Sequence, residues 1–273
     1  MDTHRISSVI FIGLLFTGVT AMHLNARQTE ARLDDMEAAR AAAAPSRPSA
    51  DAPLPTPLEL LKKSADASGG EEAWKKTSSR RLKGVYQSED TSVFLGMEIL
   101  QKFPNKSLTK ITLPNGITIR DVCDGKTAWI ENSAQGYHEY SGAALTAKLR
   151  QADFQDPGHL DQFAKSGKVT GMAKIGVHNV YILELDPDKK IHTKLYFDVD
   201  SGLIVHTEDV ISTPDGPYLV KLDLDDYRDV DGLKFPFRMK RTEKGSVILI
   251  RITQVTLNPP LDDTLFLKPD FAK

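Results

Sequence analysis

Runs of alternating apolar and polar residues dominate the chain after Lys83. Residues 220–225, 235–240 and 248–252 each place an apolar side chain at every second position. Because successive side chains of a strand point to opposite faces, each run predicts a strand with one apolar face. Glycine-bearing turns separate such runs about every ten residues, which is typical of antiparallel strands joined in sequence. The pattern therefore predicts an antiparallel meander.

Three segments have helical signals instead. Residues 56–59, Thr-Pro-Leu-Glu, combine an N-cap, a first-turn proline and a capping-box glutamate, and predict a helix that runs through Ala65 and stops at Gly69-Gly70. Residues 141–154 carry leucines four positions apart, and residues 156–167 begin with Asp-Pro and end at glycine. Two short helices are therefore expected to interrupt the sheet in mid-chain.

The balance of strands and helices predicts the architecture. Eight to ten strands carry more apolar surface than three short helices can cover as a flat layer, so the sheet is expected to curl. We predict a mainly β (α+β) fold, a curved antiparallel sheet forming an unclosed half-barrel with short helices covering its mouth. Its concave interior is either filled by side chains or open to a ligand.

The first 56 residues have a different character. Residues 6–26 follow Arg5 without any residue of fixed charge and read as a signal peptide, cleaved after Ala21 or Ala26, or as an N-terminal membrane anchor. Residues 27–56 form a helical stalk and an Ala/Pro-rich linker that cannot build a core. The folded domain is expected at 57–273, in the periplasm or cell envelope, either secreted after cleavage or anchored in the inner membrane by residues 6–26.

Composition excludes several classes of function. The 273 residues carry 35 basic and 37 acidic side chains, a formal net charge of -2, so recruitment of nucleic acid by charge is not expected. The single cysteine, Cys123, excludes an intrachain disulfide and a multi-cysteine zinc site.

One stretch, residues 195–209, gathers acidic residues and a histidine around Gly202. A calcium loop that started at Asp198 would need an oxygen ligand at its fifth position and glycine at its sixth, where the chain has Gly202 and Leu203. The Asp-Ser-Gly corner matches a hairpin with glycine in the left-handed region. We therefore predict a hairpin, with His206 solvated or paired across strands.

No other stretch predicts chemistry. Asp124-Gly125 is a strong hairpin signal, which makes Cys123 a small strand residue rather than a nucleophile. Residues 68–74 and 226–237 read as a helix end and a turn, and the histidines lack metal-ligand spacing. No catalytic residue, no metal ligand and no cofactor is predicted. An enzyme would need groups distant in sequence to converge.

Several phrases, taken in order, resemble the LolA/LolB-type lipoprotein carriers and related outer-membrane lipoprotein-sorting proteins. They are GGEEAW with LKGVY, DGKTAWI with SGAALTAKL, NVYILELDP, KLYFDVDSGLIVHTE, LDDYRDVDGLKFPFRM and LDDTLFLKP, and they cover roughly residues 57 to 271. The resemblance implies an unclosed barrel lidded by helices around an apolar cavity that takes acyl chains. The stalk has no counterpart in this resemblance.

The sequence thus predicts a non-catalytic envelope carrier of a lipid or of the acyl chains of a lipoprotein. Its partners would be that lipid or lipid-modified protein and a membrane donor or acceptor protein; the oligomeric state is left open. The alternative is a membrane-tethered sensor or protein-interaction module built on the same half-barrel. The expected cavity residues are Met97, Ile99, Phe103, Trp129, Tyr181, Leu183, Leu195, Phe197, Leu222, Leu224, Phe235, Phe237 and Met239, and the expected lid residues are Leu145, Leu149, Leu160 and Phe163.

Overall fold

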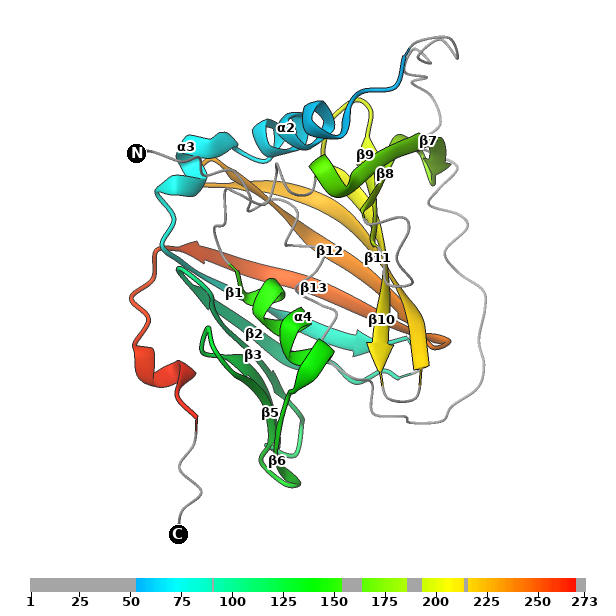
Figure 1. Cartoon of the computed structure of the whole chain (residues 1–273). Helices are drawn as coiled ribbons and strands as arrows, with labels where there is room; N and C mark the ends of the chain where they lie inside the picture. Colours follow the sequence, from blue (N-terminus) through cyan, green and yellow to red (C-terminus); the bar gives the residue numbers. More distant parts are fainter. Residues whose placement is uncertain (1–52, 90, 154–163, 186–192, 214–215, 269–273) are drawn as a thin grey trace.

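The computed structural model describes residues 53–89, 91–153, 164–185, 193–213 and 216–268 (Figure 1). The helices are α2 (Pro57–Ala67), α3 (Gly70–Lys75), α4 (Gly142–Ala152) and the 3-10 turn η3 (Asp263–Phe266). The strands are β1 (Ser79–Ser88), β2 (Leu95–Lys102), β3 (Lys106–Thr112), β4 (Thr118–Cys123), β5 (Ala128–Asn132), β6 (Gly136–Glu139), β7 (Gly167–Ile175), β8 (His178–Leu185), β9 (Thr193–Asp198), β10 (Ile204–Thr213), β11 (Gly216–Val230), β12 (Leu233–Glu243) and β13 (Ser246–Leu257).

Two predicted parts fall wholly or mostly outside this range. The segment 1–26 and most of the stalk and linker (27–56) are not among the described residues, nor is most of the expected helix at 156–167. Within the part of the chain that the structure describes, no helix is long and apolar enough to cross a membrane.

All thirteen strands belong to one antiparallel sheet. Their order is β6-β5-β4-β3-β2-β1-β13-β12-β11-β10-β9-β8-β7, so nearly every strand pairs with its neighbour in sequence, and β1 pairs with β13. The end strands β6 and β7 do not pair with each other in the described structure, and the sheet is not closed. The predicted unclosed antiparallel half-barrel is confirmed, with more strands than the eight to ten expected.

Tight turns set the register of the long central strands. Asp231-Gly232 links β11 to β12 with φ of 52° and 85°, and Lys244-Gly245 links β12 to β13 with φ of 46° and 80°. Two consecutive positive φ values are the signature of the mirror-image turns that match strand twist. The turn predicted within 226–237 is confirmed.

Residues 195–209 form a hairpin, as predicted. The β9–β10 turn places Gly202 at φ 75°, and the Gly202 amide donates to the Asp198 carbonyl at 2.8 Å. The Asp198 carboxylate accepts from the backbone N–H and the hydroxyl of Ser201, at 2.8 and 2.6 Å. The acidic residue therefore organises its own turn.

The sheet curves where the pairing of its strands is irregular, and the contacts of α4 with distant strands demonstrate this curvature. Register shifts occur at Lys83/Gly84, Ile204/His206 and Val169/Gly171, and such bulges bend and twist a sheet. Helix α4 contacts β4, β5 and also β10, although β3, β2, β1, β13, β12 and β11 lie between β4 and β10 in the sheet (Figure 1). One helix reaches both sides only because the sheet curls around it.

Helices α2 and α3 lie across one end of the concave face (Figure 1). The predicted capping box is present, with Thr56 and Glu59 exchanging hydrogen bonds. Helix α2 ends at Ala67, just before the glycine pair where the sequence predicted its stop, and a second short helix, α3, begins at Gly70. Gly69 is required for another reason: a Cβ there would lie 2.3 Å from the carbonyl oxygen of Gly232. The helix junction packs directly on the β11–β12 turn.

A second apolar cluster covers the opposite, convex face of β2–β5. The turn η3 and the chain before it close this cluster with Leu261 and Phe266. Asp263 of η3 accepts from Lys102 and Lys106 at 2.9 Å each, which fastens the C-terminal segment to the sheet. The two faces of the sheet therefore have separate cores.

Glycine 84 offers a test of the bulge between β1 and β13. A Cβ at Gly84 would lie 2.4 Å from the backbone oxygen of Arg251, whereas at Gly96 the nearest atom is 4.0 Å away. We expect Gly84→Ala to lower the free energy of unfolding by about 2 kcal/mol or more, because backbone must move. Gly96→Ala, the matched control, should change it by less than about 1 kcal/mol. Equal urea-denaturation midpoints for the two variants would contradict the close approach.

Candidate functional site

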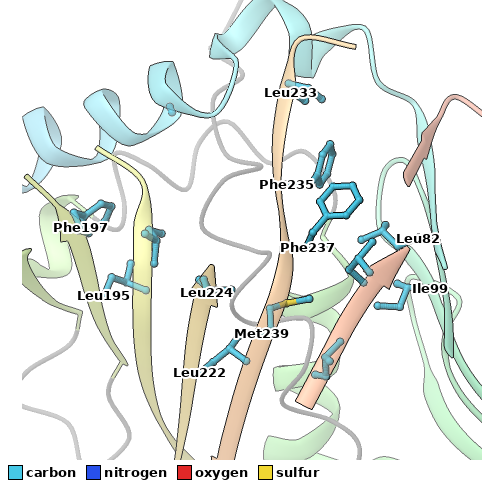
Figure 2. Packing of buried hydrophobic residues seen from close by; sticks show 14 of the residues in the cluster. Leu82, Ile99, Leu195, Phe197, Leu222, Leu224, Leu233, Phe235, Phe237 and Met239 are labelled. Atoms are coloured by element: carbon cyan, nitrogen blue, oxygen red, sulfur yellow. The ribbon is translucent and has the colours of Figure 1, made fainter. Parts of the chain in front are cut away.

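One apolar cluster occupies the concave face of the sheet (Figure 2). Its side chains come from β1–β3 and β8–β13 and from α2 and α3, and each is at most 6% exposed. On β12, for example, Leu233, Phe235, Phe237 and Met239 all point to this side, as the period of two requires. We call this set the concave cluster.

Most of the predicted cavity residues meet in the concave cluster. They are Met97, Ile99, Leu183, Leu195, Phe197, Leu222, Leu224, Phe235, Phe237 and Met239, with Tyr181 half-buried against it. The sequence prediction missed other members on the same face, among them Leu82, Ile111, Leu233, Ile248, Ile250 and Ile252. Ile248, Ile250 and Ile252 recur at every second residue, so their shared position on the concave face could have been predicted from the sequence.

Two predicted cavity residues lie elsewhere. Trp129 belongs to the convex cluster with Phe266, since the β4–β5 register pairs it with Val122 and places Cys123 and Ala128 on the concave side. Phe103 follows the last residue of β2 and is 40% exposed. The prediction that both line the concave face is corrected: Trp129 faces the convex side, and Phe103 lies beyond the end of β2.

Helix α4 covers the concave side of β4 and β5. Leu145 and Leu149 pack against Cys123, Ala128 and Ala152, in a small cluster of their own. The predicted lid residues Leu145 and Leu149 thus face the sheet, and the other two, Leu160 and Phe163, lie outside the described residues.

A buried ion pair holds α4 in place. The Lys148 ammonium donates to the Asp121 carboxylate on β4, and both side chains are nearly buried. The Tyr140 hydroxyl donates to the same carboxylate at 3.3 Å. Burial raises the pKa of Asp121, and Lys148 partly offsets this effect. The carboxylate therefore depends on α4 for its charge partner.

The two ends of the concave cluster are polar in different ways. Near α3, the Arg80 guanidinium donates to Gln101 and lies 5.7 Å from the Trp74 ring and 5.9 Å from that of Phe235. Burial lowers the pKa of Arg80 to about 9. At the other end, Arg241 donates to Glu243 at 2.7 Å, beside buried Asp209.

Comparison with solved structures finds proteins with a similar fold. A LolA superfamily protein from Nitrosomonas europaea superposes with a TM-score of 0.51 at 15% identity, over 79% of this chain and 99% of that one. A domain assigned to the outer membrane lipoprotein-sorting proteins of Vibrio parahaemolyticus gives 0.52 at 10% identity, over 77% and 95%. The chain has a LolA-type fold.

A DUF1329 family protein from Desulfovibrio piger shares this LolA-type fold, with a TM-score of 0.53 at 13% identity over 78% of this chain and 98% of that one. No protein-family model and no curated protein sequence matches the chain. At these identities the likeness is one of fold, and the site must be argued from this chain's own residues.

The outer surface of this LolA-type fold carries a polar network. His206 lies 2.6 Å from Asp223 and edge-on to the Tyr196 ring, and Tyr196 donates to Glu208 at 3.1 Å. His206 is thus paired across strands, one of the two outcomes expected from the sequence. No group of three metal-ligating side chains occurs among the described residues.

One arrangement has the components of a hydrolytic triad but not their order. Asp198 lies between His178, at 3.1 Å, and the Ser201 hydroxyl, which donates to it at 2.6 Å. In a triad the histidine must lie between the serine and the carboxylate to take the serine's proton. Here the Asp198 carboxylate lies between the histidine and the serine and contacts both, so this cluster stabilises a turn.

Cys123 makes the closure of α4 measurable. Its thiol is buried under the helix, and burial raises its pKa, so reaction with a disulfide reagent requires opening. We expect Lys148→Met to accelerate labelling about tenfold or more, because the closed state then holds an unpaired carboxylate.

The matched control is Lys126→Met, an exposed lysine in the neighbouring β4–β5 turn. Its labelling rate should equal that of the wild type. Unchanged labelling in Lys148→Met would show that the ion pair does not hold α4 closed.

Asp209 predicts a pH dependence of stability. Burial raises its pKa from 3.8 to about 6, so the folded state holds this proton more tightly than the unfolded state. The resulting stabilisation is present below about pH 4 and is lost as the pH rises to about 6, by about 3 kcal/mol in all.

Asp209→Asn should remove that loss, and the difference in unfolding free energy between variant and wild type should change across this window. Asp200→Asn, at an exposed turn position, is the control. A wild-type curve parallel to that of Asp209→Asn would show that Asp209 is not buried in the way described.

Proposed function

We propose that the protein is a non-catalytic carrier of the cell envelope that binds a lipid, or the acyl chains of a lipid-modified protein, against its concave cluster. The observation that carries this proposal is the extent of that cluster, which is continuous across β1–β3 and β8–β13. The LolA-type fold supports it, because related structures include a lipoprotein-sorting protein domain.

The energetics suit reversible binding. Each methylene group moved from water to an apolar surrounding contributes about 0.8 kcal/mol, so one ordinary acyl chain can be extracted from a membrane and returned. A donor or acceptor protein, or the opening of α4, would give the transfer its direction.

Ligand entry in this proposal requires movement. The concave side chains are almost inaccessible to solvent in the described state, and α4 spans from β4 and β5 to β10. Helix α4 is the element to move in this proposal, because its described apolar residues pack in a small cluster of their own, whereas α2 and α3 contribute Leu60, Leu61 and Trp74 to the concave cluster itself.

Envelope location is part of the proposal. It is supported by the character of residues 6–26 and by the lipoprotein-sorting protein among the relatives. Whether this segment is cleaved decides between a diffusing carrier and a tethered one, and N-terminal sequencing of the exported protein measures it directly.

A tethered interaction module is the second candidate. The strand β7 lies at the end of the sheet and is nine residues long, and among the described strands it pairs with β8 alone. An extended peptide can add to such an edge. Lys168 and Lys174 on this strand are the kind of charged side chain that discourages unspecific pairing.

Native mass spectrometry of protein purified from its own envelope tests the carrier directly. We expect a co-purifying lipid mass, and uptake of a fluorescent fatty-acid probe by the delipidated protein. Leu224→Trp, which adds bulk to the concave cluster, should weaken probe binding about fivefold, a loss of about 1 kcal/mol.

Asp225→Trp is the matched control, since the next residue on β11 is exposed on the outer face. It should leave probe binding unchanged, and melting temperatures verify that both variants fold. No co-purifying mass together with no probe uptake would refute the carrier.

A further inference from the structure

The inward face of β12 changes character along its length. Leu233, Phe235, Phe237 and Met239 are followed, at the same spacing of two, by Arg241 and Glu243. All six side chains are buried. The strand therefore lines the concave face with an apolar wall that ends in a buried guanidinium and a buried carboxyl group.

Neighbouring strands continue the polar end. Arg241 is opposite Leu222 of β11, which is in turn opposite Thr207 of β10. Glu243 is opposite Val220, which is opposite Asp209. We define the inner polar end by five inward-facing residues of three strands. They are Thr193, Thr207, Asp209, Arg241 and Glu243.

The inner polar end contains more negative than positive groups. Glu243 Oε2 accepts from Arg241 at 2.7 Å, whereas Asp209 accepts from the Thr193 hydroxyl at 2.7 Å and interacts with Arg241 only at longer range. Burial raises the pKa of both carboxyl groups. With both ionised, the buried groups sum to one negative charge.

Among the described neighbours, Lys244 offsets part of this charge, because it interacts with Glu243 from outside the cluster. Tyr86 and Tyr218 contribute hydroxyls that interact with Glu243, and the Lys244 ammonium lies on the exposed β12–β13 turn, 4.3 Å from the Tyr218 ring. The second oxygen of Glu243, Oε1, is inaccessible to solvent and makes no hydrogen bond of normal geometry in the described structure. A hydrogen-bond donor or a cation is the group that would complete this site.

The apolar wall is long enough to accommodate one layer of lipid tails. From Leu233 to Met239 it spans six residues of strand, roughly 20 Å at about 3.3 Å per residue. Half of a bilayer's hydrocarbon core is about 15 Å. A single tail along this wall brings its head to Arg241 and Glu243.

We propose that the inner polar end binds the head of the carried amphiphile, and that this head bears an ammonium group. This inference rests on the carrier function proposed above and adds the chemical class of the ligand. An ammonium donates hydrogen bonds to Asp209 and Glu243 and neutralises the surplus charge. An anionic head would add a further negative charge beside two carboxylates, with Arg241 already bound to one of them.

Three amphiphiles of equal chain length distinguish the contribution of the head to the affinity from that of the tail: dodecylamine, dodecanol and lauric acid. Calorimetric titration below their micelle concentrations, on delipidated full-length protein at pH 7.5, measures the affinity for each. We expect dodecylamine to bind at least tenfold more tightly than lauric acid, a difference of about 1.4 kcal/mol.

Two neutralising variants assign this preference to the site. Asp209→Asn and Glu243→Gln should each reduce the preference for the amine over the acid to less than threefold, with a larger change in dodecylamine affinity than in dodecanol affinity. Asp223→Asn, a carboxylate on the outer face beside His206, is the matched control and should retain the full preference.

The wild type alone supplies a readout that does not depend on how the variants fold. Lowering the pH from 7.5 to 5 protonates Asp209, so the preference for dodecylamine over dodecanol should fall. Equal binding of amine and acid, tighter binding of the acid, or a preference that survives both variants would overturn the proposed head site while the carrier stands. Failure of all three amphiphiles to bind would refute the carrier itself.

Discussion

The curvature of a sheet that does not close on itself is the constraint from which the other features follow. A flat antiparallel sheet can leave one face in water, but this one has apolar side chains on both faces of β2–β5. Curling places the concave cluster inside, and the convex apolar positions then need a separate cover, which the C-terminal segment supplies with Leu261 and Phe266. Because the curved sheet does not close, helices are needed to cover the parts of its concave face that the strands leave open. Helices α2 and α3 cover one end as part of the core, and α4 crosses from β4 and β5 to β10 with a core of its own. The separate packing of α4 is thus a consequence of where it lies.

Sequence alone was sufficient for features that depend on neighbouring residues. The capping box at Thr56 and Glu59, the hairpin at Asp198–Gly202 and the parity of β11–β13 all follow from local chemistry, and the structure confirms them. Features that depend on pairing between distant strands could not be found in this way. The face of Trp129 is decided by its register with Val122, and the glycine pair at 69–70 by the approach of Gly232. The position of α4 as a lid was expected, but its ion pair with Asp121 was not. Nothing in the segment 118–123 indicates that Asp121 is buried beside a lysine distant in sequence.

The inner polar end shows a limit of reading strands by their period. Extending the parity of Phe235, Phe237 and Met239 by two more steps reaches Arg241 and Glu243, so the pattern contains the information that these residues point inward. Charged residues at such positions read more naturally as the end of a strand, since burying them costs free energy that a sequence pattern does not reveal. Only the observed pairing of Glu243 with both Val220 and Ser246 shows that the strand continues to the hairpin.

In the proposed carrier, a buried charge surplus beside an apolar wall would affect how a ligand leaves. Arg241 and Glu243 compensate each other, whereas burial raises the pKa of Asp209 to about 6 and so disfavours its ionised form inside the fold. A cationic head would relieve that cost while it is bound, and its departure would restore it. Water admitted by the opening of α4 would solvate the carboxylates in place of the head and so lower the cost of release. Tail and head would then be governed by different elements: the tail by the apolar wall of β12 and the head by access past α4. In such an arrangement an acceptor need only stabilise the open position of α4, without competing for the tail itself.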